Sequence, residues 1–317
     1  MLLDVWGDRF EPGDCLHVFG LSRAALELAE IARYRGTSVV VSPILWYHLR
    51  SLCGAEPCWS RKARLTAGFM ARLLRVRPRD WKQQLLTHAE RVLPNSRAEA
   101  KQLMRYFGVP PEKLRVVPNG VDTTWLDRAR PPGGSEPERD IILCVGRIEP
   151  RKNQLTVIRA ARALGLPLVV VGAPLPNHAA YYEACRAAAG SEVQFLGPLP
   201  HRGPALAKLF WRARAVVLAS WYETPGLAAL EGAAAGANVV VTRFGTATDY
   251  FGEFAYYVHP GSVRSVRDAL WQAWNIAPPQ ELMIRVRTRF RWARIGRELA
   301  RVYEELRQRP VATNQAA

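Results

Sequence analysis

The fold prediction starts from residues 215–232, AVVLASWYETPGLAALEG. The first four residues of this segment form a short apolar run, which is typical of a buried strand. Pro225 suits the first turn of a helix, and the small residues after it continue one. We therefore expect a strand, a short loop and a helix, the repeating unit of a parallel α/β sheet.

The same alternation of apolar runs and helical stretches continues on both sides of this segment. Strands are expected at residues 141–145, 168–171, 193–196, 215–218 and 238–241, and helices at 153–164, 178–189, 203–213 and 226–236. Five strands with helices between them predict a doubly wound sheet. Such a sheet binds ligands beyond the carboxyl ends of its strands, so polar residues in those loops are the candidate site.

The preceding part of the chain has the same character. Strands are expected at residues 15–20, 37–42, 91–93 and 114–117, and helices at 23–35 and from Ser96 to Phe107. Gly20-Leu21-Ser22 is interpreted as a structural turn, with Ser22 capping the helix after it. Residues 131–137, PPGGSEP, are rich in turn formers and form the best linker candidate. The sequence thus predicts two α/β lobes joined by a linker.

Composition excludes several classes of protein. No apolar run approaches the ~20 residues that a transmembrane helix needs. The start of the chain lacks the apolar core of a signal peptide, so we expect a cytoplasmic protein. Five cysteines, an odd number, do not indicate a disulfide framework. The formal net charge of +16 implies an anionic partner, which is a phosphorylated ligand, an acidic membrane surface or nucleic acid.

Basic residues follow the strand expected at residues 141–145. The loop Gly146-Arg147-Ile148-Glu149-Pro150-Arg151-Lys152-Asn153 places two or three cations beside a helix start. Diphosphate groups bind where fixed positive charge meets free backbone N–H groups. The alternative interpretation is a solvated basic loop, which is common in so basic a protein.

Two acids follow the strand expected at residues 215–218. Glu223 lies just before the helix start at Gly226, where the backbone permits close approach of a ligand, and Glu231 lies within the helix. One carboxylate can then reach a sugar hydroxyl while the other accepts hydrogen bonds from a ribose. Acids are favourable near helix N-termini in any case. That explains Glu223 but not Glu231, whose neighbours are apolar and whose burial requires a partner or a function.

These motifs together resemble the donor domain of retaining glycosyltransferases of the GT-B fold, the large family-four or group 1 type. The resemblance rests on Val145-Gly146-Arg147 with Lys152-Asn153, on Glu223-x-Pro-Gly-Leu-x-x-Leu-Glu231, and on Gly245-Thr246-Ala247-Thr248-Asp249. Pro118-Asn119-Gly120-Val121-Asp122 resembles the family's passage between lobes, and Phe290-x-Trp292 with Tyr303 resembles its closing helix. The similarity spans residues 91–306 and is most specific in the C-terminal half.

The resemblance implies a role for each candidate residue. Arg147 and Lys152, after Gly146, would hold the donor diphosphate and stabilise charge as the glycosidic bond breaks. Glu223 would bind a hydroxyl of the transferred sugar, and Glu231 the ribose. Backbone amides of Gly226, Leu227 and Ala228 would complete the anion site, and Gly197 with Leu199 would line the base pocket. Catalysis is accordingly expected to depend on Glu223, Arg147 and Lys152.

Neither a metal nor another cofactor is expected. The chain has no Asp-x-Asp pair to hold a metal-bound diphosphate, which agrees with a fold that uses cationic side chains instead. His48, Cys53 and Cys58 form an incomplete ligand set without zinc-site spacing. His48 is interpreted as an ordinary loop histidine, because the position after residues 39–43 where the family often has a histidine is Ile44 here.

The implied architecture is GT-B-like, with two Rossmann-like lobes and the donor cleft between them. The predicted divisions are a shortened, incomplete N-terminal acceptor-side lobe (1–122), a linker (123–139), a donor-binding lobe (140–277), C-terminal helices crossing back to the first lobe (278–309) and a disordered tail (310–317). The resemblance implies a retaining hexosyltransferase that uses a nucleotide-sugar donor and a saccharide or lipid-linked acceptor in cell-envelope glycan synthesis. The alternative is a non-catalytic donor-binding subunit that needs a partner chain.

The stretch from Arg61 to Lys82 suggests a further partner. Its arginines Arg61, Arg64, Arg72, Arg75 and Arg79 recur at helical spacing beside an apolar stripe of Leu65, Phe69, Leu73 and Val76. A basic amphipathic helix suits an anionic membrane surface, which would place the protein peripherally at the inner face of the plasma membrane. The alternative is a surface helix that packs its stripe on the lobe's own core. No nucleic-acid partner is expected, because recognisable RRM, KH or zinc-finger patterns are missing from the sequence.

Overall fold

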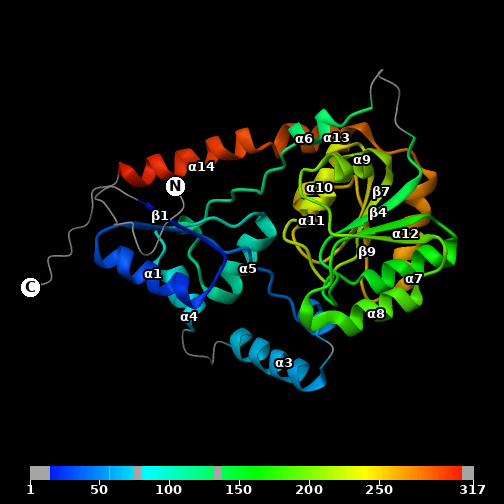
Figure 1. Cartoon of the computed structure of the whole chain (residues 1–317). Coiled ribbons are helices and arrows are strands. Elements are labelled where there is room, and N and C mark those ends of the chain that lie inside the picture. Colours follow the sequence, from blue (N-terminus) through cyan, green and yellow to red (C-terminus); the bar gives the residue numbers. More distant parts are fainter. Residues whose placement is uncertain (1–14, 57, 75–79, 132–137, 309–317) are drawn as a thin grey trace, which may run out of the picture. The chain divides into compact units, whose positions relative to one another are not determined.

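The computed structural model describes residues 15–56, 58–74, 80–131 and 138–308 (Figure 1). Arg75, Val76, Arg79, residues 132–137 of the predicted linker and the predicted tail 310–317 lie outside these residues. The first part of the predicted linker (123–139) forms a helix instead, α6 (Thr124–Arg128), in which Trp125 and Leu126 are buried. The chain divides into two compact units. The first contains the residues up to Leu45, Met70–Pro118 and the residues from Ala293 onward, and the second contains Trp46–Phe69 and Asn119–Trp292.

The second unit is built on a parallel sheet of six described strands. They are β4 (Ile141–Val145), β5 (Leu168–Val171), β6 (Val193–Gly197), β7 (Ala213–Leu218), β8 (Asn238–Thr242) and β9 (Tyr256–Val258). Their order across the sheet is β6-β5-β4-β7-β8-β9, and every neighbouring pair is parallel. The prediction of a doubly wound sheet with five of these strands is confirmed. The sequence missed β9, because a strand of three residues at a sheet edge, two of them half-buried tyrosines, carries little apolar signal.

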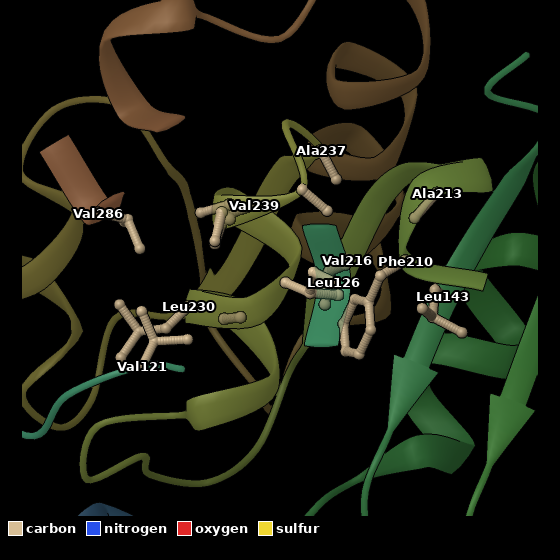
Figure 2. Close-up of a cluster of buried hydrophobic side chains, with 14 of the residues drawn as sticks. Val121, Leu126, Leu143, Phe210, Ala213, Val216, Leu230, Ala237, Val239 and Val286 are labelled. Carbon is tan, nitrogen blue, oxygen red and sulfur yellow. The ribbon is translucent and has the colours of Figure 1, made fainter. Parts of the chain in front are cut away.

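Helices cover both faces of this sheet. One face packs against α7 (Gln154–Leu164), α8 (Ala179–Ala188) and α12 (Val263–Asn275), and the other against α9 (Pro204–Arg212), α10 (Leu227–Ala234) and α13 (Gln280–Arg289). Successive strand residues alternate between the two cores: Ile142 and Cys144 join the first, whereas Leu143 joins the second. Figure 2 shows this second core, in which Phe210 of α9, Leu230 of α10 and Val286 of α13 gather with the sheet residues.

The strand order reverses between β4 and β7. From β4 the chain proceeds through β5 to β6 at one edge, and from β7 it proceeds through β8 to β9 at the other. Loops that leave the carboxyl ends of β4 and β7 therefore run to opposite sides of the sheet, and doubly wound sheets bind their ligands at such a switch point. Both predicted motifs, the basic loop and the loop with Glu223, lie there.

The first unit holds a smaller parallel sheet of β1 (Cys15–Phe19), β2 (Ser38–Ser42) and β3 (Arg91–Val92), in the order β1-β2-β3. Its helices include α1 (Arg23–Tyr34), α4 (Trp81–His88) and α5 (Arg97–Phe107). As predicted, Ser22 caps α1 by accepting a hydrogen bond from the Ala25 amide at 3.0 Å. Most of α14 (Trp292–Arg307) belongs to this unit, where Val302 packs against Val40.

The predicted strand at residues 114–117 is wrong. Leu114 forms a single parallel bridge with Val92, and the Val117 amide donates to the Pro94 carbonyl at 3.0 Å. Proline has no N–H, so Pro94 cannot return a hydrogen bond to this segment. The ladder therefore stops after one bridge.

The predicted basic helix from Arg61 to Lys82 is also wrong in its extent. The described helix is α3 (Trp59–Leu73), and a separate helix, α4, starts after Asp80, whose side chain accepts from the Gln83 amide. Arg72 does not lie on an exposed basic face: its side chain is 9% exposed, pairs with Asp80 and lies 4.4 Å from the ring centre of Phe107. The sequence pattern could not reveal this burial, because Phe107 is distant along the chain.

The segment Trp46–Phe69 was placed in the first lobe by sequence, whereas its contacts group it with the second unit. Gly54 of α2 (Leu49–Ala55) lies against the Trp221 ring so closely that an added Cβ would come 2.1 Å from Trp221 Cε3. The His48 ring stacks on Phe244 with centroids 4.9 Å apart. Among the described residues, no helix is long and apolar enough to cross a membrane.

Candidate functional site

The loop between β4 and α7 starts at Gly146, which lies in close contact with Gly172 at the end of the neighbouring strand β5. Gly146 has φ +154°, and a Cβ on Gly172 would come 2.0 Å from the Gly146 carbonyl oxygen. Only glycine at position 172 allows this approach. At the loop's other end, Asn153 adopts φ +58°. Its side-chain Nδ2 donates to the backbone carbonyls of Ala219 (2.9 Å) and Pro260 (2.8 Å). The side chain of Asn153 therefore fastens the start of α7 to the carboxyl end of β7.

Lys152 and Glu223 are the predicted site residues that come into direct contact. Lys152 Nζ donates to Glu223 Oε1 at 2.7 Å, and Ser220 Oγ donates to the same oxygen at 2.5 Å. Both side chains are largely removed from water, with 16% of Lys152 and 5% of Glu223 exposed. Removing an ion pair from water costs solvation energy, and good geometry with additional hydrogen bonds must offset this cost. Ser220 was not predicted, although it lies three residues before Glu223.

Arg147 lies in the same loop without contacting this ion pair. Its side chain is 61% exposed, and its Nη2 lies 3.6 Å from Glu149 Oε1. Arg151 pairs more closely with the same Glu149 oxygen, at 2.8 Å, and its carbonyl accepts from the Trp221 amide at 2.8 Å. Arg151 thus joins the β4 loop to the β7 loop, whereas Arg147 remains an exposed cation at the edge of the site.

Glu223 is held by the neighbouring β8 loop as well. Its amide donates to the Phe244 carbonyl at 3.2 Å, and its carbonyl accepts from the Thr246 amide at 3.0 Å. Gly245 between them has φ +121°, and a Cβ there would come 2.1 Å from the Glu223 carbonyl oxygen. Loops from β4, β7 and β8, three neighbouring strands, therefore converge on this one glutamate.

The helix α10 starts directly after this loop. Gly226 has φ +85° and precedes Leu227, the first helical residue, while the amides of Ala229 and Leu230 donate to the Gly226 carbonyl. The first amides of a helix, here those of Leu227 and Ala228, lack partners within the helix and favour anions. This agrees with the position predicted for an anion site.

Glu231 lies on the same helix with a different partner. Its side chain is 11% exposed, and its Oε1 lies 3.2 Å from Nε2 of His201. Burial raises the pKa of Glu231, while the hydrogen bond from His201 and the charges of His201 and Arg202 oppose that rise. The sequence did not single out His201, although it lies two residues beyond Leu199 in the loop that follows β6.

The structure thus brings some predicted residues together and leaves others apart. Lys152 joins Glu223, and Arg147 lies on the loop of Lys152. Gly197, with φ +68°, is the last residue of β6, and Leu199 lies in the following loop, which carries His201. His48 was predicted to be an ordinary loop histidine, and its ring stacks on that of Phe244. The backbone carbonyl of Phe244 accepts the hydrogen bond from the Glu223 amide. The arrangement combines a cation, buried carboxylates and a helix start, which suits a phosphorylated ligand with several hydroxyl groups.

These features define an α/β protein of the GT-B class, with a doubly wound sheet and with cations and a helix start at its switch point. Residues 127–285 match the family model of glycosyl transferases group 1, and residues 14–125 match that of Glycosyltransferase Family 4. The chain belongs to the glycosyl transferases group 1 family.

Curated relatives match mainly one half of the chain. The D-inositol 3-phosphate glycosyltransferase of Rhodococcus opacus is 32% identical over 181 residues, which cover 51% of this chain and 40% of the relative. The protein of the same name from Mycolicibacterium paratuberculosis is 36% identical over 174 residues, covering 51% and 39%. The matched part thus spans about two fifths of the length of these relatives.

Solved structures share the fold over most of the chain. Sucrose-phosphate synthase from Thermosynechococcus elongatus has a TM-score of 0.68 at 19% identity, covering 92% of this chain and 73% of that one. Anabaena Alr3699/HepE in complex with UDP and glucose has a TM-score of 0.63 at 17% identity, covering 91% and 78%. At this identity the likeness concerns the fold alone.

Proposed function

We propose that the chain is a retaining glycosyltransferase. It binds a nucleotide diphosphate sugar at the carboxyl edge of the second unit's sheet and transfers the hexose to a saccharide or lipid-linked acceptor. The observation that carries the proposal is the contact of Lys152 with Glu223, 2.7 Å long, beside the start of α10. A diphosphate needs a fixed cation and free amides, and a sugar needs a nearby hydrogen-bond acceptor.

In this mechanism the bond between the anomeric carbon and the phosphate oxygen breaks, and its electron pair leaves with the nucleoside diphosphate. Lys152, the exposed Arg147 and the first amides of α10 stabilise the negative charge on that leaving group. The acceptor hydroxyl gives its proton to the departing phosphate oxygen and bonds to the anomeric carbon on the face that the leaving group vacates. Glu223 holds a hydroxyl of the transferred sugar and fixes its orientation. The cationic side chains make a divalent metal or other cofactor unnecessary.

The names of related proteins indicate which substrates to test first. The curated relatives are called D-inositol 3-phosphate glycosyltransferases, and a fold neighbour was solved with UDP and glucose. UDP-glucose as donor and inositol phosphate as acceptor are therefore the first candidates, followed by GDP-sugars and lipid-linked acceptors. A role in cell-envelope glycan synthesis agrees with lipid-linked acceptors.

We also propose a peripheral position at the cytoplasmic face of an anionic membrane. Helix α3 carries a Trp59 side chain that is 82% exposed, beside the exposed cations Arg61 and Arg64. An aromatic ring beside arginines suits the boundary between acidic headgroups and acyl chains. With Arg72 removed from this surface by its pairing with Asp80, the contact depends on the first half of α3.

Release of nucleoside diphosphate from a panel of donor sugars tests the function, with and without acceptors and cell membranes. Turnover that persists in a chelator and is lost in Lys152→Ala supports the proposal. Lys208→Ala is the matched control, because Lys208 is an exposed cation on α9. Donor binding without turnover under any condition would instead favour a donor-binding subunit that needs a partner chain. Absence of donor binding would refute both.

A further inference from the structure

His201 occupies a position that the proposed donor site does not yet explain. It lies in the loop between β6 and α9, and its Nε2 reaches Glu231 Oε1 on α10 at 3.2 Å. The His201 side chain is 66% exposed, whereas that of Glu231 is 11% exposed. Within the described residues, His201 is the hydrogen-bond partner recorded for the Glu231 carboxylate. The imidazole thus covers a buried carboxylate on its solvent side.

The loop that carries His201 is held in place from two further sides. The His201 ring makes an edge contact with Trp125 of α6 (Thr124–Arg128), with centroids 6.1 Å apart. The next residue, Arg202, has φ +62° and pairs with Asp122 at 3.5 Å. Because Trp125 is itself buried, these contacts restrict the positions that the imidazole can take. These contacts keep the loop of His201 beside α6 and the imidazole within reach of Glu231.

From this geometry we propose that His201 is a positioning residue for the nucleoside part of the donor, holding the Glu231 carboxylate in place to accept the ribose hydroxyls. This role rests on the proposed function. A carboxylate has about four lone-pair sites on its two oxygens, so it can accept from His201 and from a ribose diol at once. His201 also lies in the loop of Leu199, directly after Gly197 at the end of β6, and these two residues are expected at the base.

The charges around Glu231 add a pH-dependent consequence. Burial raises the pKa of Glu231, and the groups that lower it again are His201 and Arg202, both from the β6 loop. The neighbours of Glu231 on α10 are apolar. Removing His201 therefore raises the pKa of Glu231 further, and the carboxylate is protonated at a higher pH. A protonated carboxyl accepts ribose hydroxyls less well, so nucleotide binding would be lost at a higher pH.

Calorimetric titration of the full chain with UDP and with inorganic pyrophosphate tests this role. We expect His201→Ala to weaken UDP binding about 10-fold near neutral pH, which is the effect of losing one hydrogen bond to a charged group. Pyrophosphate binding should be unchanged, because Lys152 and the start of α10 remain intact. The pH below which UDP affinity is lost should move upward, in the direction of the raised Glu231 pKa. His201→Gln, whose amide can donate the same hydrogen bond, should recover most of the affinity.

The matched control is His88→Ala. His88 faces Glu30 at 3.7 Å in the first unit, so it is a histidine–carboxylate pair outside the candidate site. Wild-type UDP affinity in His201→Ala, or equal loss of UDP and pyrophosphate, would overturn the role of His201. Failure of the wild type to bind any nucleotide would overturn the donor site itself, and the two results are thus distinguishable.

Discussion

Lys152 and Glu223 are 71 positions apart in the chain and form an ion pair of 2.7 Å in a largely buried environment. They meet because β4 and β7 are neighbours in the sheet and both residues follow the carboxyl ends of these strands. The ion pair holds the lysine at the edge where the diphosphate is expected. A phosphorylated ligand must therefore compete with Glu223 for the Lys152 ammonium group, or share it.

Removing Lys152 should destabilise the protein as well as abolish donor binding. Lys152→Met leaves the Glu223 carboxylate buried with Ser220 as its remaining side-chain partner. Breaking a buried pair in this way typically costs about 3 kcal/mol in the free energy of unfolding. Urea denaturation without ligand measures the loss, with Lys152→Arg as the control that keeps the charge. An unchanged midpoint for Lys152→Met would mean that the ion pair contributes nothing to stability.

Gly245 should not tolerate a side chain. In Gly245→Ala the new Cβ would come 2.1 Å from the Glu223 carbonyl oxygen, at a residue with φ +121°. Backbone strain and the clash together should lower the free energy of unfolding by at least about 2 kcal/mol and displace Glu223. Gly165→Ala is the matched control: its φ is +63° but nothing lies within 4 Å, so about 1 kcal/mol is expected. Thermal unfolding measures both variants. Equal losses of stability in Gly245→Ala and Gly165→Ala would contradict the close approach of Gly245 to the Glu223 carbonyl.

Glu99 should make stability depend on pH. It accepts from the amides of Leu45 (2.5 Å) and Asn95 (2.7 Å), yet burial raises its pKa from 4.5 to about 7. Between these values the folded state binds more protons than the unfolded state. The free energy of unfolding therefore falls as pH rises through this range, by on the order of 3 kcal/mol in total.

The measurement is the difference in stability between the wild type and Glu99→Gln at each pH. The difference is needed because burial lowers the pKa of His17 to about 4, which gives the opposite slope below the unfolded value of 6.5. The advantage of the wild type over Glu99→Gln should shrink as the pH rises from about 5 to about 8. A difference that stays constant would show that Glu99 is ionised in the folded protein throughout.

The membrane contact predicts a charge-dependent affinity for vesicles. Replacing both Arg61 and Arg64 by Gln should weaken binding to phosphatidylserine-containing vesicles about 30-fold, from roughly 1 kcal/mol for each cation. Co-sedimentation measures this, and added salt should weaken the wild type in the same direction. The control replaces two exposed cations of α5, Arg97 and Lys101, by Gln. Similar losses in both double variants would indicate attraction by net charge instead of a contact through α3.

Local patterns predicted most of the second unit's sheet. Runs such as residues 168–171 and 238–241 are continuously apolar, and a parallel strand covered on both faces requires this. The motif from Glu223 to Glu231 indicated a loop and helix start at a ligand-binding edge, and the structure places it at the switch point. Weakly apolar elements such as β9 were missed.

Local sequence patterns predicted most strands and helices of the second unit, the family, and the chemical character of the loops at the sheet's edge. Those depend on side-chain periodicity and on residues close together in the chain. The tertiary structure alone decided which distant groups meet: Lys152 with Glu223, His201 with Glu231, His48 with Phe244, and Arg72 with Phe107. Such contacts follow from strand order and helix packing, which local patterns do not encode, because a parallel strand's neighbour can come from anywhere along the chain.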